Sequence, residues 1–127
     1  MKKKTRILTV DDEPVISESI ATLLEAPHRE IVVAKNGQEA LAKAAKRKFD
    51  VVITDHRMPN AGGLELVKKL RQQNYRGKIV VLSGHLSAHN IGIYEDLEVD
   101  EVVSKPLDLV ELPHIVEGLE DDLEFGL

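Results

Sequence analysis

Two short apolar stretches that end in acidic residues decide the fold of this chain: Ile7–Asp12 (ILTVDD) and Val51–Asp55 (VVITD). Both are too apolar for surface loops, and their β-branched residues favour β-strands. If the two strands are parallel neighbours, Asp11, Asp12 and Asp55 converge on one edge of a sheet. Three carboxylates that close repel one another, and a bound cation is the usual remedy. The sequence therefore predicts a cation site where two strands end.

Strand-like and helix-like patterns alternate along the rest of the chain. Further apolar strands are expected at residues 31–34, 79–82 and 102–103, and each strand is followed by apolar residues at helical spacing. Asn36, Ser87 and Asp108 are predicted N-caps, and Asp12 or Glu13 is expected to cap the first helix, which starts at Pro14. Five such units predict an α/β fold, (βα)5, with a doubly wound parallel five-stranded sheet covered on both faces.

The bulk composition excludes several classes of function. The chain has 127 residues, which suits one domain, and it has no cysteine, so disulfides and thiolate sites are excluded. No apolar stretch has the length of a membrane span. Lys2–Lys4 is interpreted as a basic tail, because no signal-peptide pattern follows it. The net charge is −5 and aromatic residues make up 3% of the chain, which argues against a nucleic-acid binder. We expect a cytoplasmic protein without direct nucleic-acid or membrane contact.

Four motifs together resemble the receiver domains of two-component response regulators, in particular single-domain regulators of the chemotaxis type. They are Ile7–Glu13 (ILTVDDE), Asp55–Pro59 (DHRMP) with Gly63 beyond, Val81–Gly84 (VLSG) and Ser104–Pro106 (SKP). Each motif alone is weak, but their order and spacing together are highly specific. The resemblance covers essentially residues 1–127, includes no effector domain, and implies a flavodoxin-like sheet with strand order 2-1-3-4-5.

The resemblance also implies a chemistry for the expected edge of the sheet. Asp55 would be the phosphoacceptor, a nucleophile that takes a phosphoryl group from a phosphohistidine. Lys105 would place a positive charge on the phosphoryl oxygens, and the Ser83 hydroxyl would donate to another of them. The protein would then be a signalling switch and not an enzyme in the usual sense, since it catalyses only its own phosphorylation and dephosphorylation.

Mg2+ is the cofactor that this resemblance implies. Asp12, Asp55 and the backbone carbonyl of Arg57 would be direct ligands, and Asp11 would hold a metal-bound water. Oxygen ligands of this kind suit Mg2+, which keeps several of its waters in proteins.

The same resemblance implies protein partners. A sensor histidine kinase or a histidine phosphotransfer protein would supply the phosphoryl group, and a downstream protein or effector domain would receive the signal. The face formed by the fourth helix, fifth strand and fifth helix would be the output surface and a homodimer contact, with the first helix as an alternative surface.

Some alternatives remain open at this level. Asp11 or Asp12 alone could equally be a helix cap, and a pseudo-receiver, a binding module without phosphotransfer, could share the fold. His56 is not expected to act as a base, because neighbouring residues of an extended segment point to opposite faces. Val102 stands where the family commonly has Tyr or Phe, and a β-branched side chain is too stiff to swing as an aromatic ring does. The signal is therefore expected to leave through the Ser83–Ser87 loop and the fourth helix.

Overall fold

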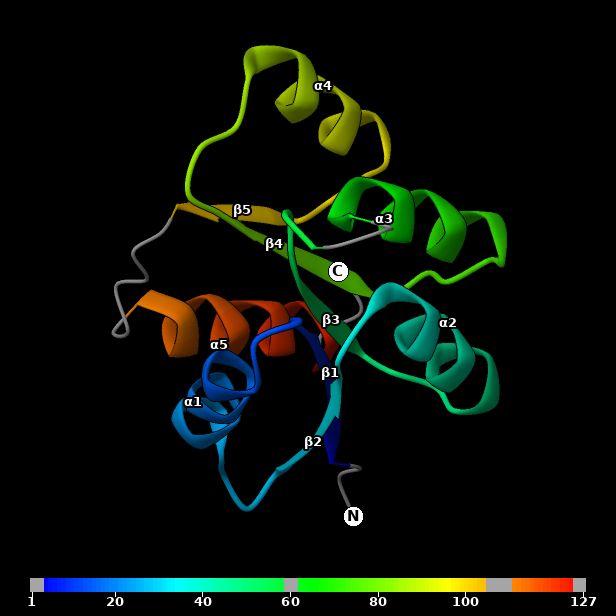
Figure 1. The fold of residues 1–127 in the computed structure, drawn as a ribbon. Helices are drawn as coiled ribbons and strands as arrows, with labels where there is room; N and C mark the ends of the chain where they lie inside the picture. Colours follow the sequence, from blue (N-terminus) through cyan, green and yellow to red (C-terminus); the bar gives the residue numbers. More distant parts are fainter. Residues whose placement is uncertain (1–3, 59–61, 105–110, 125–127) are drawn as a thin grey trace.

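The alternating segments build a single parallel sheet with helices on both faces (Figure 1). The computed structural model describes residues 4–58, 62–104 and 111–124. The strands are β1 (Thr5–Val10), β2 (Arg29–Ala34), β3 (Val51–Asp55), β4 (Lys78–Ser83) and β5 (Glu101–Ser104). The helices are α1 (Pro14–Leu24), α2 (Gly37–Lys46), α3 (Gly63–Gln72), α4 (Ala88–Asp96) and α5 (Glu111–Glu124). All strand pairs are parallel and their order is β2-β1-β3-β4-β5, which confirms the predicted fold.

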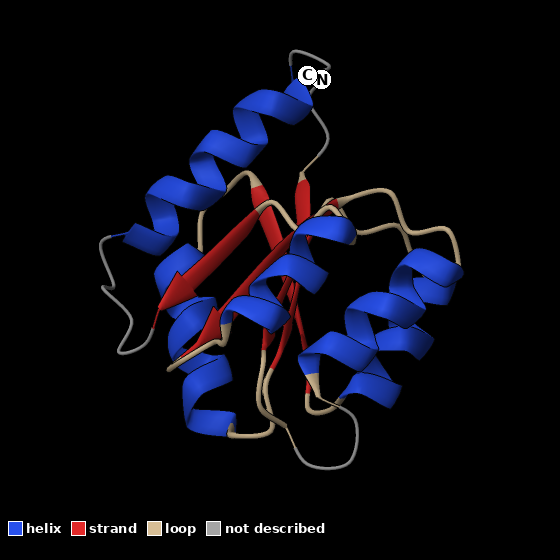
Figure 2. Cartoon of the chain, turned by 90° about the horizontal axis from the view of Figure 1, so that it is seen from above, coloured by secondary structure: helices blue, strands red, loops and turns tan. Residues whose placement is uncertain are grey.

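The two faces of the sheet carry two separate cores. Helices α2, α3 and α4 pack on one face, and α1 and α5 pack on the other (Figure 2). Successive residues of a strand point to opposite faces, so Leu8 and Val52 belong to the first core while Ile7 and Ile53 belong to the second. Every residue of β3 is buried, as expected for the central strand of a sheet covered on both sides.

The helix starts test the predicted caps. The side-chain oxygen of Asn36 accepts a hydrogen bond from the backbone N–H of Glu39 at 2.8 Å, and that of Ser87 accepts one from Asn90 at 3.1 Å. Both caps are therefore confirmed. At α1 the N-cap position is Glu13, but its side chain makes no capping hydrogen bond. Pro14 at the first helical position has no N–H, so this helix start has one unpaired donor fewer. The predicted cap Asp108 lies outside the described residues.

Four strands start before the predicted boundaries. β1 begins at Thr5 instead of Ile7, and β4 spans Lys78–Ser83 instead of residues 79–82. β2 begins at Arg29 and β5 begins at Glu101, because polar residues at their starts continue the pairing with β1 and β4.

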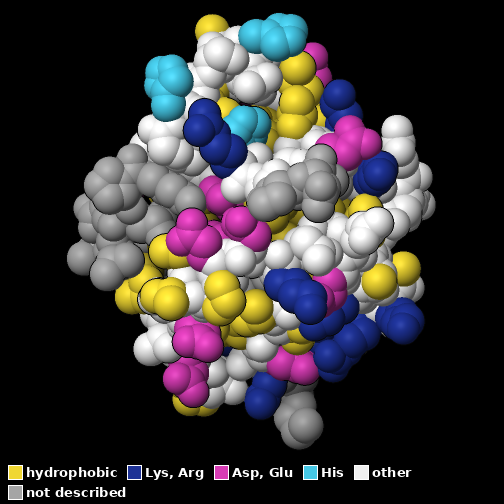
Figure 3. Space-filling model, in the orientation of Figure 1, with side chains coloured by type: hydrophobic (Ala, Val, Ile, Leu, Met, Phe, Trp, Pro, Cys, Tyr) yellow, Lys and Arg dark blue, Asp and Glu magenta, His cyan; other side chains and the backbone are white. Residues whose placement is uncertain are grey.

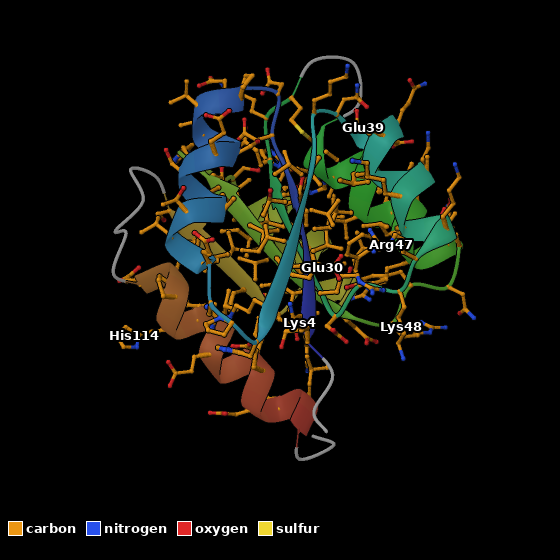
Figure 4. All side chains as sticks on the ribbon, turned by 90° about the horizontal axis from the view of Figure 1, so that it is seen from below. Lys4, Glu30, Glu39, Arg47, Lys48 and His114 are labelled. Atoms are coloured by element: carbon orange, nitrogen blue, oxygen red, sulfur yellow. The ribbon has the colours of Figure 1, made fainter. Side chains whose placement is uncertain are left out.

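The start of β2 also carries ion pairs, because Glu30 contacts Arg6 of β1 and Arg47, just after α2, each at 3.0 Å. Glu30 and Arg47 are labelled in Figure 4. Among the described helices, none has both the length and the apolar composition needed to cross a bilayer.

Candidate functional site

Three carboxylates meet where β1 and β3 end. Asp11 and Asp12 follow β1 directly and Asp55 is the last residue of β3. Val10 pairs with Thr54 across these neighbouring strands, so the two ends lie at the same level of the sheet. Each of the three residues offers a carboxylate oxygen that lies within 4.8 Å of the others. The predicted convergence is thus observed, and acidic side chains gather near the middle of the face shown in Figure 3.

The surroundings of the three carboxylates differ. Asp11 and Asp55 are buried, with 3% and 6% of their surface exposed, whereas Asp12 is exposed. The backbone N–H of Glu13 donates to Oδ1 of Asp11 at 2.9 Å, which orients that carboxylate. Asp11 itself donates from its backbone N–H to the carbonyl of Ala34 at 3.2 Å. Two of the carboxylates are therefore held in the sheet edge, and the third faces solvent.

Ser83 lies at the same edge, at the end of β4. It directly follows Leu82, which pairs with Asp55, and 6% of its surface is exposed. Its hydroxyl donates to the backbone carbonyl of His85 at 3.1 Å. The predicted ligand position Arg57 follows β3 by two residues and has an exposed side chain. Lys105, the remaining predicted site residue, lies outside the described residues.

A glycine brings the start of α3 against the backbone of the site. Gly63 donates its N–H to the carbonyl of His56 at 2.9 Å. A Cβ atom at this position would lie 2.5 Å from the carbonyl oxygen of Asp55 and 2.9 Å from Cα of His56. A side chain at position 63 would therefore force the backbone at Asp55 and His56 to shift. The sequence predicted turn geometry here but not this close approach.

His56 points away from the carboxylates into the core beneath α4. Its Nδ1 and the hydroxyl of Tyr94 share a hydrogen bond of 2.5 Å, and the rings are edge to face with centroids 5.6 Å apart. Burial lowers the pKa of His56, although the charge of Asp55 acts in the opposite direction. Burial also raises the pKa of Tyr94. A neutral histidine and a protonated phenol suit this bond, and Nδ1 is the acceptor when the histidine carries its proton on Nε2. The expectation that His56 is no base for Asp55 agrees with this geometry.

The order of the motifs and the carboxylate cluster at the ends of β1 and β3 can be compared with known protein families. Residues 7–117 match the family model described as the response regulator receiver domain. The chain belongs to this receiver-domain family. The predicted family is thereby confirmed.

Among curated relatives, this receiver domain is 43% identical over 82 residues to a response regulator receiver protein of Anaeromyxobacter sp., covering 65% of this chain and 34% of that protein. It is 36% identical over 110 residues to the alkaline phosphatase synthesis transcriptional regulatory protein PhoP of Bacillus subtilis, covering 84% of this chain and 43% of that protein. The chain thus spans less than half the length of both relatives.

Solved receiver structures have the same fold. The chemotaxis protein CheY4 of Vibrio cholerae superposes with a TM-score of 0.84 at 30% identity, covering 91% of this chain and 98% of that chain. The response regulator TrrA of Thermotoga maritima, solved in complex with Mg2+ and BeF, superposes with a TM-score of 0.78 at 36% identity, again covering 91% and 98%. The receiver fold thus accounts for nearly all of the chain.

Proposed function

We propose that this receiver domain accepts a phosphoryl group on Asp55 with the help of Mg2+, and that phosphorylation switches its contacts with other proteins. The observation that carries the proposal is the cluster of Asp11, Asp12 and Asp55, whose carboxylate oxygens lie within 4.8 Å of one another at the ends of two adjacent strands. Similarity to a regulator solved with Mg2+ and BeF supports the same reading. A pseudo-receiver would be expected to lack part of the acidic set or Lys105, and the sequence retains all of them.

The donor set fits Mg2+. Carboxylate and carbonyl oxygens are the hard ligands that this ion prefers. Asp12, Asp55 and the backbone carbonyl of Arg57 would hold it, and Asp11 would hold one of its waters. When bound, Mg2+ supplies positive charge that offsets the carboxylates and the phosphoryl oxygens.

The residues of the chain then have separate tasks in the transfer. A carboxylate oxygen of Asp55 attacks the phosphorus of a phosphohistidine, the P–N bond breaks, and the imidazole nitrogen leaves with the electron pair of that bond. Lys105 would stabilise the charge on the transferred group. The Ser83 hydroxyl would exchange its bond to the His85 carbonyl, 3.1 Å in this structure, for one to a phosphoryl oxygen.

The partners follow from this chemistry. The donor would be a sensor histidine kinase or a histidine phosphotransfer protein, and the recipient a downstream protein or effector domain. The face of α4, β5 and α5 is the proposed output surface and homodimer contact, where Ile91 and Val102 are each 38% exposed. The alternative face, α1, carries Val15 at 71% exposure. The cytoplasmic location stays a prediction.

Intact mass spectrometry tests the assignment. The native chain should gain one phosphoryl group from acetyl phosphate with Mg2+, and none when the divalent ion is chelated. Asp55→Asn keeps the size of the side chain but removes the nucleophilic carboxylate, so it should gain none under either condition. Equal labelling of the native chain and Asp55→Asn would show that Asp55 is not the acceptor.

A further inference from the structure

Helix α4 has few attachments to the rest of the domain. Tyr94 is its single buried residue and is 0% exposed. Just beyond the helix, Nε of Arg71 donates to the carbonyl of Leu97 and its Nη2 donates to that of Glu98, each at 2.9 Å.

The loop before α4 is largely exposed, from Gly84 onward. In Figure 1 the helix stands beyond β5, and residues 84–87 and 97–100 connect it to β4 and β5. Tyr94 is thus the one fully buried side chain that anchors the described part of α4, and the half-buried Leu86 and Leu97 pack against the core on either side of the helix.

The side chain of Tyr94 leads directly to the phosphoacceptor strand. The hydroxyl of Tyr94 is bonded to Nδ1 of His56, which is the residue after Asp55. The same hydroxyl would lie 3.2 Å from a Cβ at Gly63, so it sits between the end of β3 and the start of α3. His56 is in turn fixed by its backbone N–H, which donates to the carbonyl of Leu82 in β4 at 2.9 Å. A shift of the backbone at Asp55 therefore reaches Tyr94 through one side chain.

We propose that His56 and Tyr94 are positioning residues that couple the state of Asp55 to the docking of α4 on the sheet. This inference rests on the proposed function, since the state in question is the phosphorylation of Asp55. A buried hydroxyl that loses its hydrogen-bond partner costs free energy, so intermediate positions of α4 with a stretched Tyr94–His56 bond are unfavourable. The bond therefore favours two distinct positions of α4, one with the bond formed and one with it broken. Val102 is 38% exposed and aliphatic, so it offers no buried polar bond for the same task.

The coupling must also work in the reverse direction. If phosphorylation changes how firmly α4 docks, then a change in α4 docking must alter the affinity of the site for a phosphoryl mimic by the same factor. A residue that only fills the core would lower stability in both states equally and would leave the response to the mimic unchanged. This difference separates a positioning role from a structural one.

The test compares two tyrosines of the same chain. Tyr94→Phe removes the hydroxyl that meets His56 and keeps the ring. Tyr75→Phe is the matched control, because the Tyr75 hydroxyl donates to the carbonyl of Lys78 at 3.2 Å, at the opposite end of β4 from Ser83. Each protein is first checked for phosphoryl gain from acetyl phosphate by intact mass. Amide hydrogen exchange of residues 88–96 is then measured with Mg2+, with and without beryllofluoride.

We expect beryllofluoride to change the exchange rate of α4 by about fivefold or more in the native chain and in Tyr75→Phe, and by less than about twofold in Tyr94→Phe. All three should gain the phosphoryl group. A full α4 response in Tyr94→Phe would overturn the coupling while leaving phosphorylation of Asp55 intact. A native chain that gains no phosphoryl group would overturn the proposed function itself, and the coupling with it.

A second pair of variants keeps the test decisive if Tyr94→Phe does not fold. The side-chain amide of asparagine can place its oxygen near the position of Nδ1, so His56→Asn should accept the Tyr94 hydrogen bond and retain the α4 response. His56→Leu has a similar volume without an acceptor and should lose it. Equal responses of the two variants would overturn the proposal.

Discussion

At the scale of single residues, Asp12 is the exposed member of the three-carboxylate cluster, and Glu13 beside it is exposed as well. Asp12→Ala should weaken Mg2+ binding at least about tenfold, because it removes one oxygen ligand and one negative charge from the site. Glu13→Ala removes the same charge from the neighbouring position without removing a proposed ligand. We expect that control to change the Mg2+ affinity by less than about twofold. Calorimetric titration at fixed ionic strength measures both.

The affinity of the native site should also fall as pH is lowered, since protons compete with Mg2+ for the carboxylates. Equal loss of affinity in Asp12→Ala and Glu13→Ala would mean that Asp12 acts only through its charge. Unchanged affinity in Asp12→Ala would remove Asp12 from the set of ligands.

Gly63 gives a second prediction at this scale. The Cβ of Gly63→Ala would lie 2.5 Å from the carbonyl oxygen of Asp55, and this neighbour is backbone that cannot simply rotate away. We expect a loss of about 1–3 kcal/mol in the free energy of unfolding, measured by urea denaturation. Gly118→Ala in α5 is the control, because nothing lies within 4 Å of its added Cβ. That variant should be neutral or more stable by up to about 1 kcal/mol. The reverse order of the two variants would contradict the described packing at Gly63.

At the scale of elements, α4 should be among the least stable parts of the domain. Its single buried residue is Tyr94, and Gly92 interrupts the helix with a residue that favours the unfolded chain. An added Cβ at Gly92 meets nothing within 4 Å. Gly92→Ala should therefore slow amide exchange in residues 88–96 by about fivefold, the equivalent of about 1 kcal/mol. Global unfolding by urea should change less than this local opening. Unchanged exchange in α4 would mean that the helix opens only when the whole domain unfolds.

The sequence predicted the helices and strands, but it did not predict the contacts between them. Apolar runs ending in Asp11 and Asp55 predicted the strands, and the caps Asn36 and Ser87 predicted two helix starts, because these signals are local in the sequence. The bond between His56 and Tyr94 joins residues 38 apart. No periodicity or spacing in the sequence predicts this hydrogen bond, because the bond depends on how α4 packs against the sheet. The close approach of Gly63 to Asp55 was missed for the same reason.

At the scale of the whole molecule, one partly buried ion pair connects three parts of the domain that are distant in the sequence. The side chains of Arg29 at the start of β2 and Glu120 in α5 are 8% and 13% exposed, and Nη2 of Arg29 lies 2.5 Å from Oε1 of Glu120. Nη1 of Arg29 also donates to the carbonyl of Leu24 at the end of α1, at 3.0 Å. The sheet edge, α1 and α5 thus share one guanidinium. The pair consequently stabilises the packing of α1 and α5 against one face of the sheet.

The charge of Glu120 makes this stabilisation depend on pH. Burial raises the pKa of Glu120, but hydrogen bonds from Arg29 and Thr5 and the charge of Arg29 outweigh it, so the pKa is lowered in the folded state. A carboxyl with a lowered folded pKa contributes stability above its unfolded value of 4.5, and this contribution is lost as pH falls through the folded pKa. The domain should lose this part of its stability below about pH 4.5.

Glu120→Gln isolates this contribution. The amide keeps the size and an acceptor but not the charge, so the free energy of unfolding at pH 7 should fall by about 1.5–3 kcal/mol. The curve of stability against pH should also become flatter below about pH 4.5, because the group that titrated in the folded state is gone. Glu117→Gln, which changes the same charge at an exposed position of α5, should leave both quantities close to native. Urea unfolding from pH 3 to pH 7 measures all three proteins. Parallel curves for the native chain and Glu120→Gln would show that this ion pair does not set the acid stability of the domain.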